Sequence, residues 1–203
     1  MMLHFLTWYR TRISQVFGLA FILLFIFSSK VLETTAPYAA GVLFMLGCIL
    51  VGVATVGRMW CAQYIAGYKD SVLVREGPYS VCRNPLYFFS FLGCIGVGLC
   101  TESLVLTGIL LVVFMIVYPF IIRSEEAKLQ RHFGSAYTAY VQEVPRFFPD
   151  FRLYHEPKTY AVSPKVFRHA AFDVLWFIWA VGILECLEGL QEAGIIPLLL
   201  QIY

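Results

Sequence analysis

Four long stretches of this 203-residue chain contain no Asp, Glu, Lys or Arg, and they limit the folds that it can adopt. They cover residues 13–29, 34–57, 84–101 and 103–122 and have 17, 24, 18 and 20 residues. About 20 apolar residues cross the hydrocarbon core of a bilayer, and a charge at its centre costs about 2.5–3.5 kcal/mol. Each stretch is therefore predicted to be a transmembrane helix, with Glu102 alone in a tight hairpin between the third and the fourth.

The composition of the whole chain agrees, because 60% of the residues are hydrophobic and only 14% are charged. Soluble domains have about 45–50% apolar and about 25% charged residues. A net charge of +2 excludes a nucleic-acid-binding module, and the six cysteines include no C-x-x-C pair that would indicate a zinc ribbon or a redox pair. We therefore expect an all-α, polytopic membrane helix bundle with no nucleic-acid partner and no metal site.

The carboxyl-terminal part of the chain gives a weaker signal. Residues 169–184 are apolar except for Asp173, and they are predicted to form a fifth transmembrane helix. The run 193–203 is too short to cross a bilayer and contains Pro197, which favours a re-entrant or interfacial tail. The chain is thus predicted to be a single integral membrane domain, 1–203, built from about five helices.

The basic residues predict the orientation of this bundle. Fourteen of the 15 Lys and Arg residues lie in the amino-terminal arm, in 58–83 or in 123–168, and Lys30 is the exception. Short loops rich in Lys and Arg stay in the cytoplasm. We therefore expect a multi-pass protein of a bacterial inner membrane whose amino terminus and two polar segments, 58–87 and 123–152, face the cytoplasm.

The two polar segments carry the candidate functional residues. The first contains Gly77-Pro78-Tyr79 and then Arg83-Asn84-Pro85-Leu86-Tyr87, in which the proline suits the first turn of the next helix. The second contains Glu125-Glu126, then a stripe with Tyr137 and Tyr140, and then Val144-Pro145-Arg146-Phe147. Adjacent carboxylates at a membrane boundary are costly unless they are paired or solvated. Each piece alone is compatible with a helix cap, a snorkelling side chain or ordinary packing.

Taken in order, with a glycine-dotted helix between them, these motifs closely resemble the superfamily of isoprenylcysteine carboxyl methyltransferases and phospholipid methyltransferases, which are integral membrane enzymes. The pattern of that family is Gly-Pro-Tyr-x-x-x-Arg-His-Pro-x-Tyr, a hydrophobic span and then Glu-Glu. The resemblance covers 73–149 as a methyltransferase-like core and leaves 150–203 as linker, fifth helix and tail. Asn84 stands where the family has histidine; it keeps a donor and an acceptor but does not titrate near neutral pH.

The resemblance implies S-adenosylmethionine as the methyl donor, held in a pocket at the cytosolic face. It also implies a lipid-like or small hydrophobic acceptor that enters from the bilayer, so that substrate and membrane lipids are the expected partners. The implied catalytic residues are Arg83, Glu126 and Arg146. The implied cofactor-binding residues are Tyr79, Asn84, Pro85, Tyr87, Gly96, Gly98, Glu125, Glu126, Tyr140, Pro145, Arg146 and Phe147.

These residue types suit that chemistry. An arginine can bind the donor's carboxylate in a bidentate manner, glutamates can take its ammonium or its ribose diol, and aromatic rings attract its cationic sulfonium. A thiolate or carboxylate acceptor needs little more than positioning. An amine or phenol acceptor needs a base, for which Glu126 is the candidate, and the sequence does not specify which acceptor is used.

Two other functions remain open from the sequence. Membrane sterol or enone reductases that use NADPH share a similar helical architecture and an Arg-His-Pro-Asn-Tyr element. They follow the tyrosine with an acidic pair, whereas Tyr87 is followed by Phe88-Phe89-Ser90. A non-enzymatic transporter places ionisable residues near the bilayer midplane, and Asp173 is the candidate there.

Overall fold

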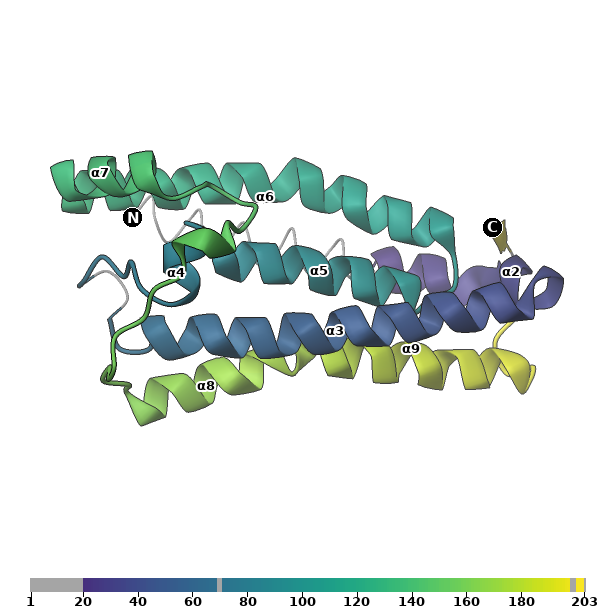
Figure 1. Cartoon of the computed structure of the whole chain (residues 1–203). Helices are drawn as coiled ribbons and strands as arrows, with labels where there is room; N and C mark the ends of the chain where they lie inside the picture. The colour runs from purple at the N-terminus through teal and green to yellow at the C-terminus, as the bar shows by residue number, and fades with distance from the viewer. Residues whose placement is uncertain (1–19, 69–70, 198–199, 203) are drawn as a thin grey trace, which may run out of the picture.

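The computed structural model describes residues 20–68, 71–197 and 200–202, and its long helices run side by side along one direction (Figure 1). The long helices are α3 (Pro37–Ile65), α5 (Pro85–Leu99), α6 (Leu104–Phe133), α8 (Pro164–Val174) and α9 (Trp176–Glu192). The short elements are β1 (Ser28–Lys30), α2 (Val31–Thr35), α4 (Pro78–Val81), α7 (Ser135–Glu143), the 3-10 helix η1 (Phe151–Leu153) and β2 (Leu200–Ile202). The expected helical membrane bundle is confirmed, and its one small addition is the parallel pairing of β1 with β2.

Three units of the described chain are long and apolar enough to cross a membrane: α3, α6 and the 29 residues Pro164–Glu192. The last unit contains the predicted fifth helix and is interrupted at Leu175, between α8 and α9. α5 has only 15 residues and spans about 22 Å, less than the roughly 30 Å of the hydrocarbon core. The first predicted span, 13–29, lies partly outside the described residues, and its residues 20–27 are helical.

Two helices extend past the apolar stretches that predicted them. α3 continues from residue 57 to Ile65, and α6 continues from residue 122 to Phe133. Charged residues are unfavourable in a helix only where it lies in hydrocarbon. A helix can therefore continue beyond the end of its apolar stretch. Gly134, with a φ of 54°, ends α6. These extensions carry the charged residues considered below.

α3 and α5 pack closely because glycine lies at their contact. A Cβ atom on Gly96 would lie 2.8 Å from both the carbonyl oxygen of Gly47 and the amide nitrogen of Val51. A side chain does not fit at that distance, so glycine at position 96 lets the two backbones approach. Small residues at helix contacts are typical of membrane proteins, whose helices associate largely through van der Waals packing.

The turn between α5 and α6 is the predicted hairpin. Glu102 has a φ of 55°, and the hydroxyl of Thr101 donates to the carbonyl of Gly98 at 2.6 Å. Ser103 caps α6, since its hydroxyl oxygen accepts a hydrogen bond of 3.3 Å from the amide of Leu106. The connection is therefore short and well ordered by its own polar groups.

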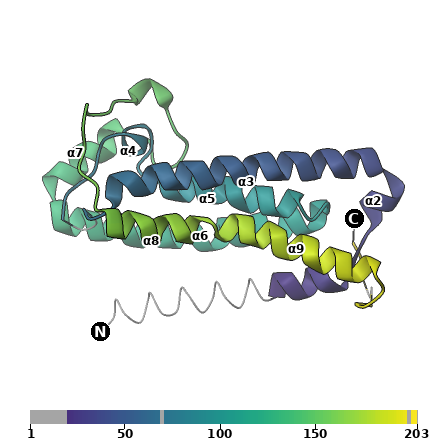
Figure 2. The same ribbon diagram turned by 90° about the horizontal axis from the view of Figure 1, so that it is seen from below.

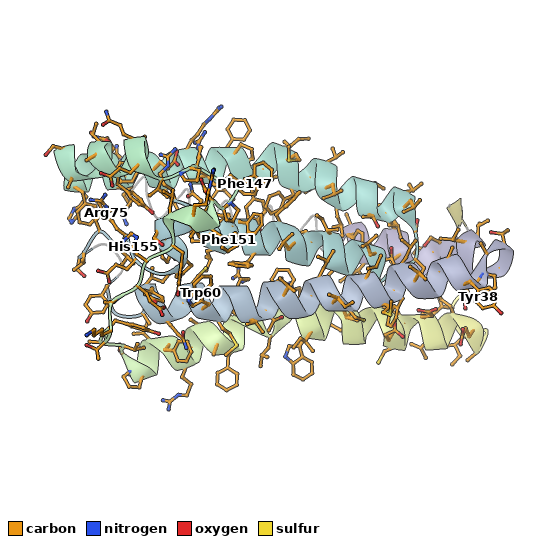
Figure 3. The ribbon with its side chains drawn as sticks, in the orientation of Figure 1. Tyr38, Trp60, Arg75, Phe147, Phe151 and His155 are labelled. Atoms are coloured by element: carbon orange, nitrogen blue, oxygen red, sulfur yellow. The ribbon has the colours of Figure 1, made fainter. Side chains whose placement is uncertain are left out.

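The polar segments gather at one end of the bundle. α4, α7 and the loop after α7 lie where α3 and α6 end and α5 begins, whereas α2 and the β1–β2 pair lie at the opposite end (Figure 1, Figure 2). Figure 3 shows Arg75, Phe147 and His155 at the first end and Tyr38 at the other. The segments that hold most of the basic residues therefore meet in space, and we call this the basic end.

Candidate functional site

Residues 82–85 connect α4 to α5 at the basic end, and they are fixed by a loop from much later in the chain. The amide of Arg83 donates to the carbonyl of Pro145 at 2.9 Å. The thiol of Cys82 donates to the carbonyl of Phe147 at 3.0 Å. These bonds hold the loop after α7 against the start of α5.

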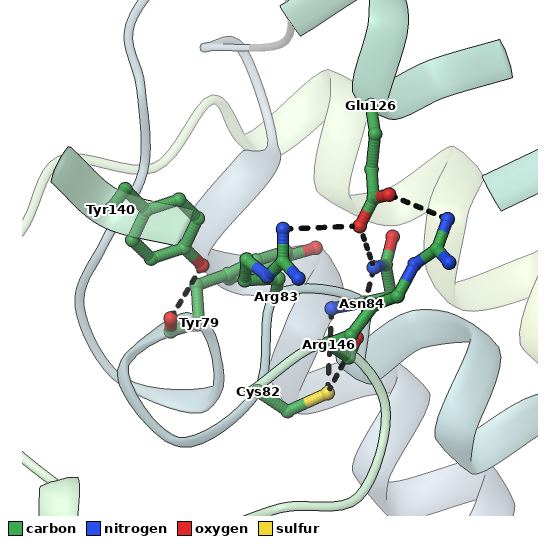
Figure 4. Close-up of polar contacts among 7 residues, drawn as sticks. All are labelled: Tyr79, Cys82, Arg83, Asn84, Glu126, Tyr140 and Arg146. Atoms are coloured by element: carbon green, nitrogen blue, oxygen red, sulfur yellow. Dashed lines mark hydrogen bonds and ion pairs between the residues drawn. The ribbon is translucent and has the colours of Figure 1, made fainter. Parts of the chain in front are cut away.

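Glu126, in the extension of α6, is the centre of the cluster that results (Figure 4). Its Oε1 lies 3.4 Å from Nη1 of Arg83 and accepts a hydrogen bond of 3.0 Å from Nδ2 of Asn84. Its Oε2 lies 2.7 Å from Nη2 of Arg146. The side chains of Arg83 and Glu126 are 12% and 15% exposed, and that of Arg146 is 42% exposed. Two guanidinium groups thus share one carboxylate in a site largely shielded from water.

Asn84, at the position of the family histidine, joins this cluster to the loop. Its Nδ2 donates both to Glu126 and, at 2.9 Å, to the carbonyl of Arg146. An amide nitrogen carries two hydrogens, whereas a neutral imidazole carries only one N–H. Because Glu126 already accepts from Asn84 and two arginines, this geometry favours a binding role for the carboxylate over the role of base.

Two buried polar atoms in this cluster make no well-formed hydrogen bond in the described part of the chain: Nε of Arg83 and the hydroxyl of Tyr137, which lies close to the Arg83 guanidinium. Burial raises the pKa of Tyr137 and the charge of Glu126 raises it further, whereas the charge of Arg83 and a side-chain interaction with Arg83 lower it. Buried polar groups without partners are rare, and each needs an explanation. An anionic group of a bound molecule would satisfy both atoms. From the sequence, Tyr137 was expected to pack in a stripe with Tyr140, and only the spacing of the two tyrosines hinted at more.

Tyr140 ties α7 to α4. Its hydroxyl donates to the carbonyl of Tyr79 at 2.6 Å, and the guanidinium carbon of Arg75 lies 5.4 Å from the centre of its ring. Burial raises the pKa of Tyr140, so its hydroxyl stays protonated near neutral pH. Tyr140 therefore positions the wall of the site and does not act as a base.

A row of aromatic rings leads from the loop into the bundle. The ring of Phe147 lies 6.0 Å from that of Phe88 and 5.9 Å from that of Phe91, measured between centroids. Phe91 lies 5.2 Å from Phe114, which stacks on Tyr118 at 3.8 Å. The cluster around Glu126 thus adjoins an apolar, aromatic region between α5 and α6, which the sequence did not locate because the chain is rich in aromatic residues throughout.

Three further predicted residues lie near the cluster. Pro85 is buried as the first residue of α5, and the ring of Tyr87 lies 5.6 Å from that of Tyr118. Glu125 lies near Tyr79, whose pKa is raised chiefly by burial and also by the charge of Glu125.

Gly96 and Gly98, in contrast, are not brought to this cluster. They lie 12 and 14 residues along α5 from Asn84, or about 18–21 Å, and they contact α3 and α6 respectively. In the structure they serve helix packing, and we leave them out of the candidate site.

Cys82 gives a test of this packing. Burial raises the pKa of its thiol from 9.0 to about 11, although the Asn84 amide and the charge of Arg83 lower it. A pKa higher by two units gives a roughly 100-fold smaller thiolate fraction at pH 8. We expect iodoacetamide to alkylate Cys82 about 100-fold more slowly in the folded protein than in the same protein denatured, as followed by peptide mass spectrometry.

The raised pKa of Cys82 also makes the stability of the folded protein depend on pH. The folded state retains the thiol proton more strongly, so this contribution to stability is complete below pH 9 and is lost between about pH 9 and 11. Equal alkylation rates in the folded and denatured protein at pH 8 would contradict the buried position of Cys82.

One group of side chains with metal-ligand spacing occurs among the described residues, far from Glu126. Carboxylate oxygens of Glu33, Glu102 and Glu188 lie within 4.8 Å of one another at the end opposite the basic end. Acidic residues cluster in this way without an ion, and Glu102 and Glu188 have other interactions. Nothing in the structure assigns a metal to them.

Comparison with known proteins identifies the family. The family model described as phospholipid methyltransferase matches residues 36–136. The chain is also 38% identical to the cobalt-zinc-cadmium resistance protein CzcN of Cupriavidus metallidurans over 159 residues, which are 78% of this chain and 73% of that protein. This chain belongs to the phospholipid methyltransferase family. The resemblance seen in the motifs is thereby confirmed, and the match begins ahead of them, at α3, which packs along α5.

A second relative has the same relation to the chain. It is the nickel-cobalt-cadmium resistance protein NccN of Alcaligenes xylosoxydans xylosoxydans, 39% identical over 160 residues, which are 79% of this chain and 75% of that protein. No solved structure matches the chain.

Proposed function

We propose that this member of the phospholipid methyltransferase family binds S-adenosylmethionine at the Glu126 cluster and methylates a hydrophobic acceptor from the bilayer. The observation that carries the proposal is the buried Nε of Arg83, which has no partner in the described part of the chain, beside the buried hydroxyl of Tyr137 and two arginines that share one carboxylate. Such a site suits a ligand that bears both an anionic and a cationic group. The aromatic row beside it suits an apolar acceptor.

The residues present fit the proposed cofactor. In this proposal Arg83 and Tyr137 bind its carboxylate, Glu126 and Glu125 bind its ammonium or its diol, and Phe147 faces its cationic sulfur. When bound, S-adenosylmethionine supplies an electrophilic methyl group.

The contribution of this chain is then mainly positional. The loop that carries Arg146 and Phe147 is bonded to residues 82–84, and in this proposal it fixes the arginines and helps to exclude water from the bound cofactor. Among the described site residues, Glu126 is occupied by three donors and Asn84 does not titrate. Orientation and water exclusion supply the catalysis in this proposal.

The names of the relatives suggest the cellular process that the proposed activity serves. Both are named for resistance to divalent metals, including cobalt and cadmium. Two arginines already share the carboxylate of Glu126, so this cluster does not suit a metal cation. We therefore infer that this chain supports metal tolerance by methylating a membrane constituent rather than by ligating the metal at this site.

Calorimetry with S-adenosylhomocysteine tests the proposal on the purified full-length protein. We expect saturable binding by the wild type and an affinity about fivefold lower for Arg146→Ala, because a half-exposed charge pair contributes roughly 1 kcal/mol. Glu143→Gln, which removes the exposed partner of Arg75, is the matched control and should bind as the wild type does.

The same titration separates the alternatives. No binding of S-adenosylhomocysteine together with binding of NADPH would reverse the proposal in favour of a reductase. The transporter alternative relied on Asp173, but its side chain is exposed on α8 rather than enclosed by the bundle. Proton-coupled uptake that is abolished in Asp173→Asn would restore that alternative.

A further inference from the structure

Arg58 lies in the extension of α3 and turns toward two other helices. Its Nη1 donates to the hydroxyl of Ser90 on α5, and its guanidinium carbon lies 5.6 Å from the ring centre of Phe177 on α9. The ring of Phe177 occupies the space that a side chain at Gly93 would need, so it is held against α5. Arg58 is therefore enclosed by three helices and is not extended along the surface.

This guanidinium has no anionic partner in the part of the chain that the structure describes. Its Nε is buried without a hydrogen-bond partner, and the ion pairs of the described residues involve other arginines. Arginine stays charged in proteins, and an uncompensated charge in hydrocarbon is unfavourable. A cation held in place within a membrane helix bundle is by default a functional residue whose partner should be sought.

The depth of Arg58 indicates the kind of partner. Arg58 lies seven residues before the end of α3, or about 10 Å, and the whole of α3 spans about 43 Å, which exceeds the roughly 30 Å of hydrocarbon. Trp176 and Trp179, next to Phe177 in α9, are 61% and 65% exposed, so apolar surface lies beside the Arg58 guanidinium. Arg58 thus lies near the level at which lipids carry their charged groups.

We propose that Arg58, Ser90 and Phe177 form a binding site for the anionic oxygen group, phosphate or carboxylate, of an amphiphile. The guanidinium binds the oxygens. Ser90, whose hydroxyl donates to the carbonyl of Leu86 at 2.7 Å and accepts from Arg58, holds the guanidinium in place together with the ring of Phe177. The exposed apolar residues of α9, such as Trp176 and Trp179, contact the apolar chain of the amphiphile. Two sources offer this chemistry: an anionic phospholipid of the surrounding leaflet, or a carboxylate amphiphile such as an acidic acceptor. The inference goes beyond the proposed methyltransferase activity and does not depend on it.

Native mass spectrometry of the full-length protein tests this site. In equal mixtures of phosphatidylglycerol and phosphatidylcholine, we expect the wild type to retain the anionic lipid with at least a fivefold preference. Arg58→Gln should reduce that preference to near unity, whereas Arg58→Lys, which keeps the charge, should retain part of it. Arg152→Gln is the matched control, because Arg152 is exposed and paired with Asp150.

A second arm, with decanoate against decanol, distinguishes the sources. Loss of phosphatidylglycerol retention alone in Arg58→Gln assigns the site to a resident lipid, and loss of decanoate retention alone assigns it to a carboxylate amphiphile. The proposal is overturned if the wild type prefers neither anion over its neutral match, or if Arg58→Gln keeps the preference of the wild type. Because these are binding measurements on folded protein, they stand even if S-adenosylhomocysteine does not bind.

Discussion

Glu126→Gln is expected to raise the dissociation constant for S-adenosylhomocysteine by at least about 30-fold, or roughly 2 kcal/mol. Glutamine keeps the size of the side chain and an acceptor for Asn84, but it removes the charge that Arg83 and Arg146 share. Removing one partner from a buried ion pair costs about 3–5 kcal/mol. The exposure of Arg146 reduces that figure, whereas Arg83, 12% exposed, retains most of the penalty. Calorimetry measures the loss of affinity, and a thermal melt measures the loss of stability.

The control for this variant is Glu143→Gln, because it also neutralises a glutamate that pairs with an arginine. Glu143 is 61% exposed, so solvent compensates for its loss and we expect less than about 1 kcal/mol in stability and no change in affinity. An unchanged affinity in Glu126→Gln would show that the Glu126 cluster is not where the ligand binds.

Gly96→Ala is expected to lower the free energy of unfolding by about 2–3 kcal/mol, although it adds only one methyl group. The new Cβ would lie 2.8 Å from the Gly47 carbonyl and from the Val51 amide, which are backbone atoms that cannot rotate away. α3 and α5 must therefore separate along their contact. Thermal unfolding of the purified protein in detergent measures the loss.

Gly108→Ala, five residues into α6, is the matched control for this variant. No atom lies within 4 Å of the position that its Cβ would take, so we expect no loss of stability. The affinity of folded Gly96→Ala for S-adenosylhomocysteine should equal that of the wild type. A weakened affinity without loss of stability would instead return Gly96 to the cofactor site that the family resemblance implied.

The sequence predicted an apolar helical bundle because the preference of a segment for hydrocarbon is a local property. A stretch without charges reports its own preference for hydrocarbon, so the hairpin at Glu102 and the helical bundle followed from the sequence. The ends of α3 and α6 did not, since helices continue into water where hydropathy no longer marks them. The four residues in direct contact at the site, Arg83, Asn84, Glu126 and Arg146, were also found from the sequence, through their resemblance to a family motif.

The tertiary structure alone decided which of these groups meet and what they do. The sharing of Glu126 by two arginines, the buried hydroxyl of Tyr137 and the packing role of Gly96 depend on how three distant segments are oriented about their helix axes. The orientation of each helix about its axis is set by side-chain packing against other elements, so it cannot be predicted from the sequence of one segment. Arg58 shows this most clearly: in the sequence it is one more basic residue near a membrane boundary, and in the fold it is a cation enclosed by α3, α5 and α9.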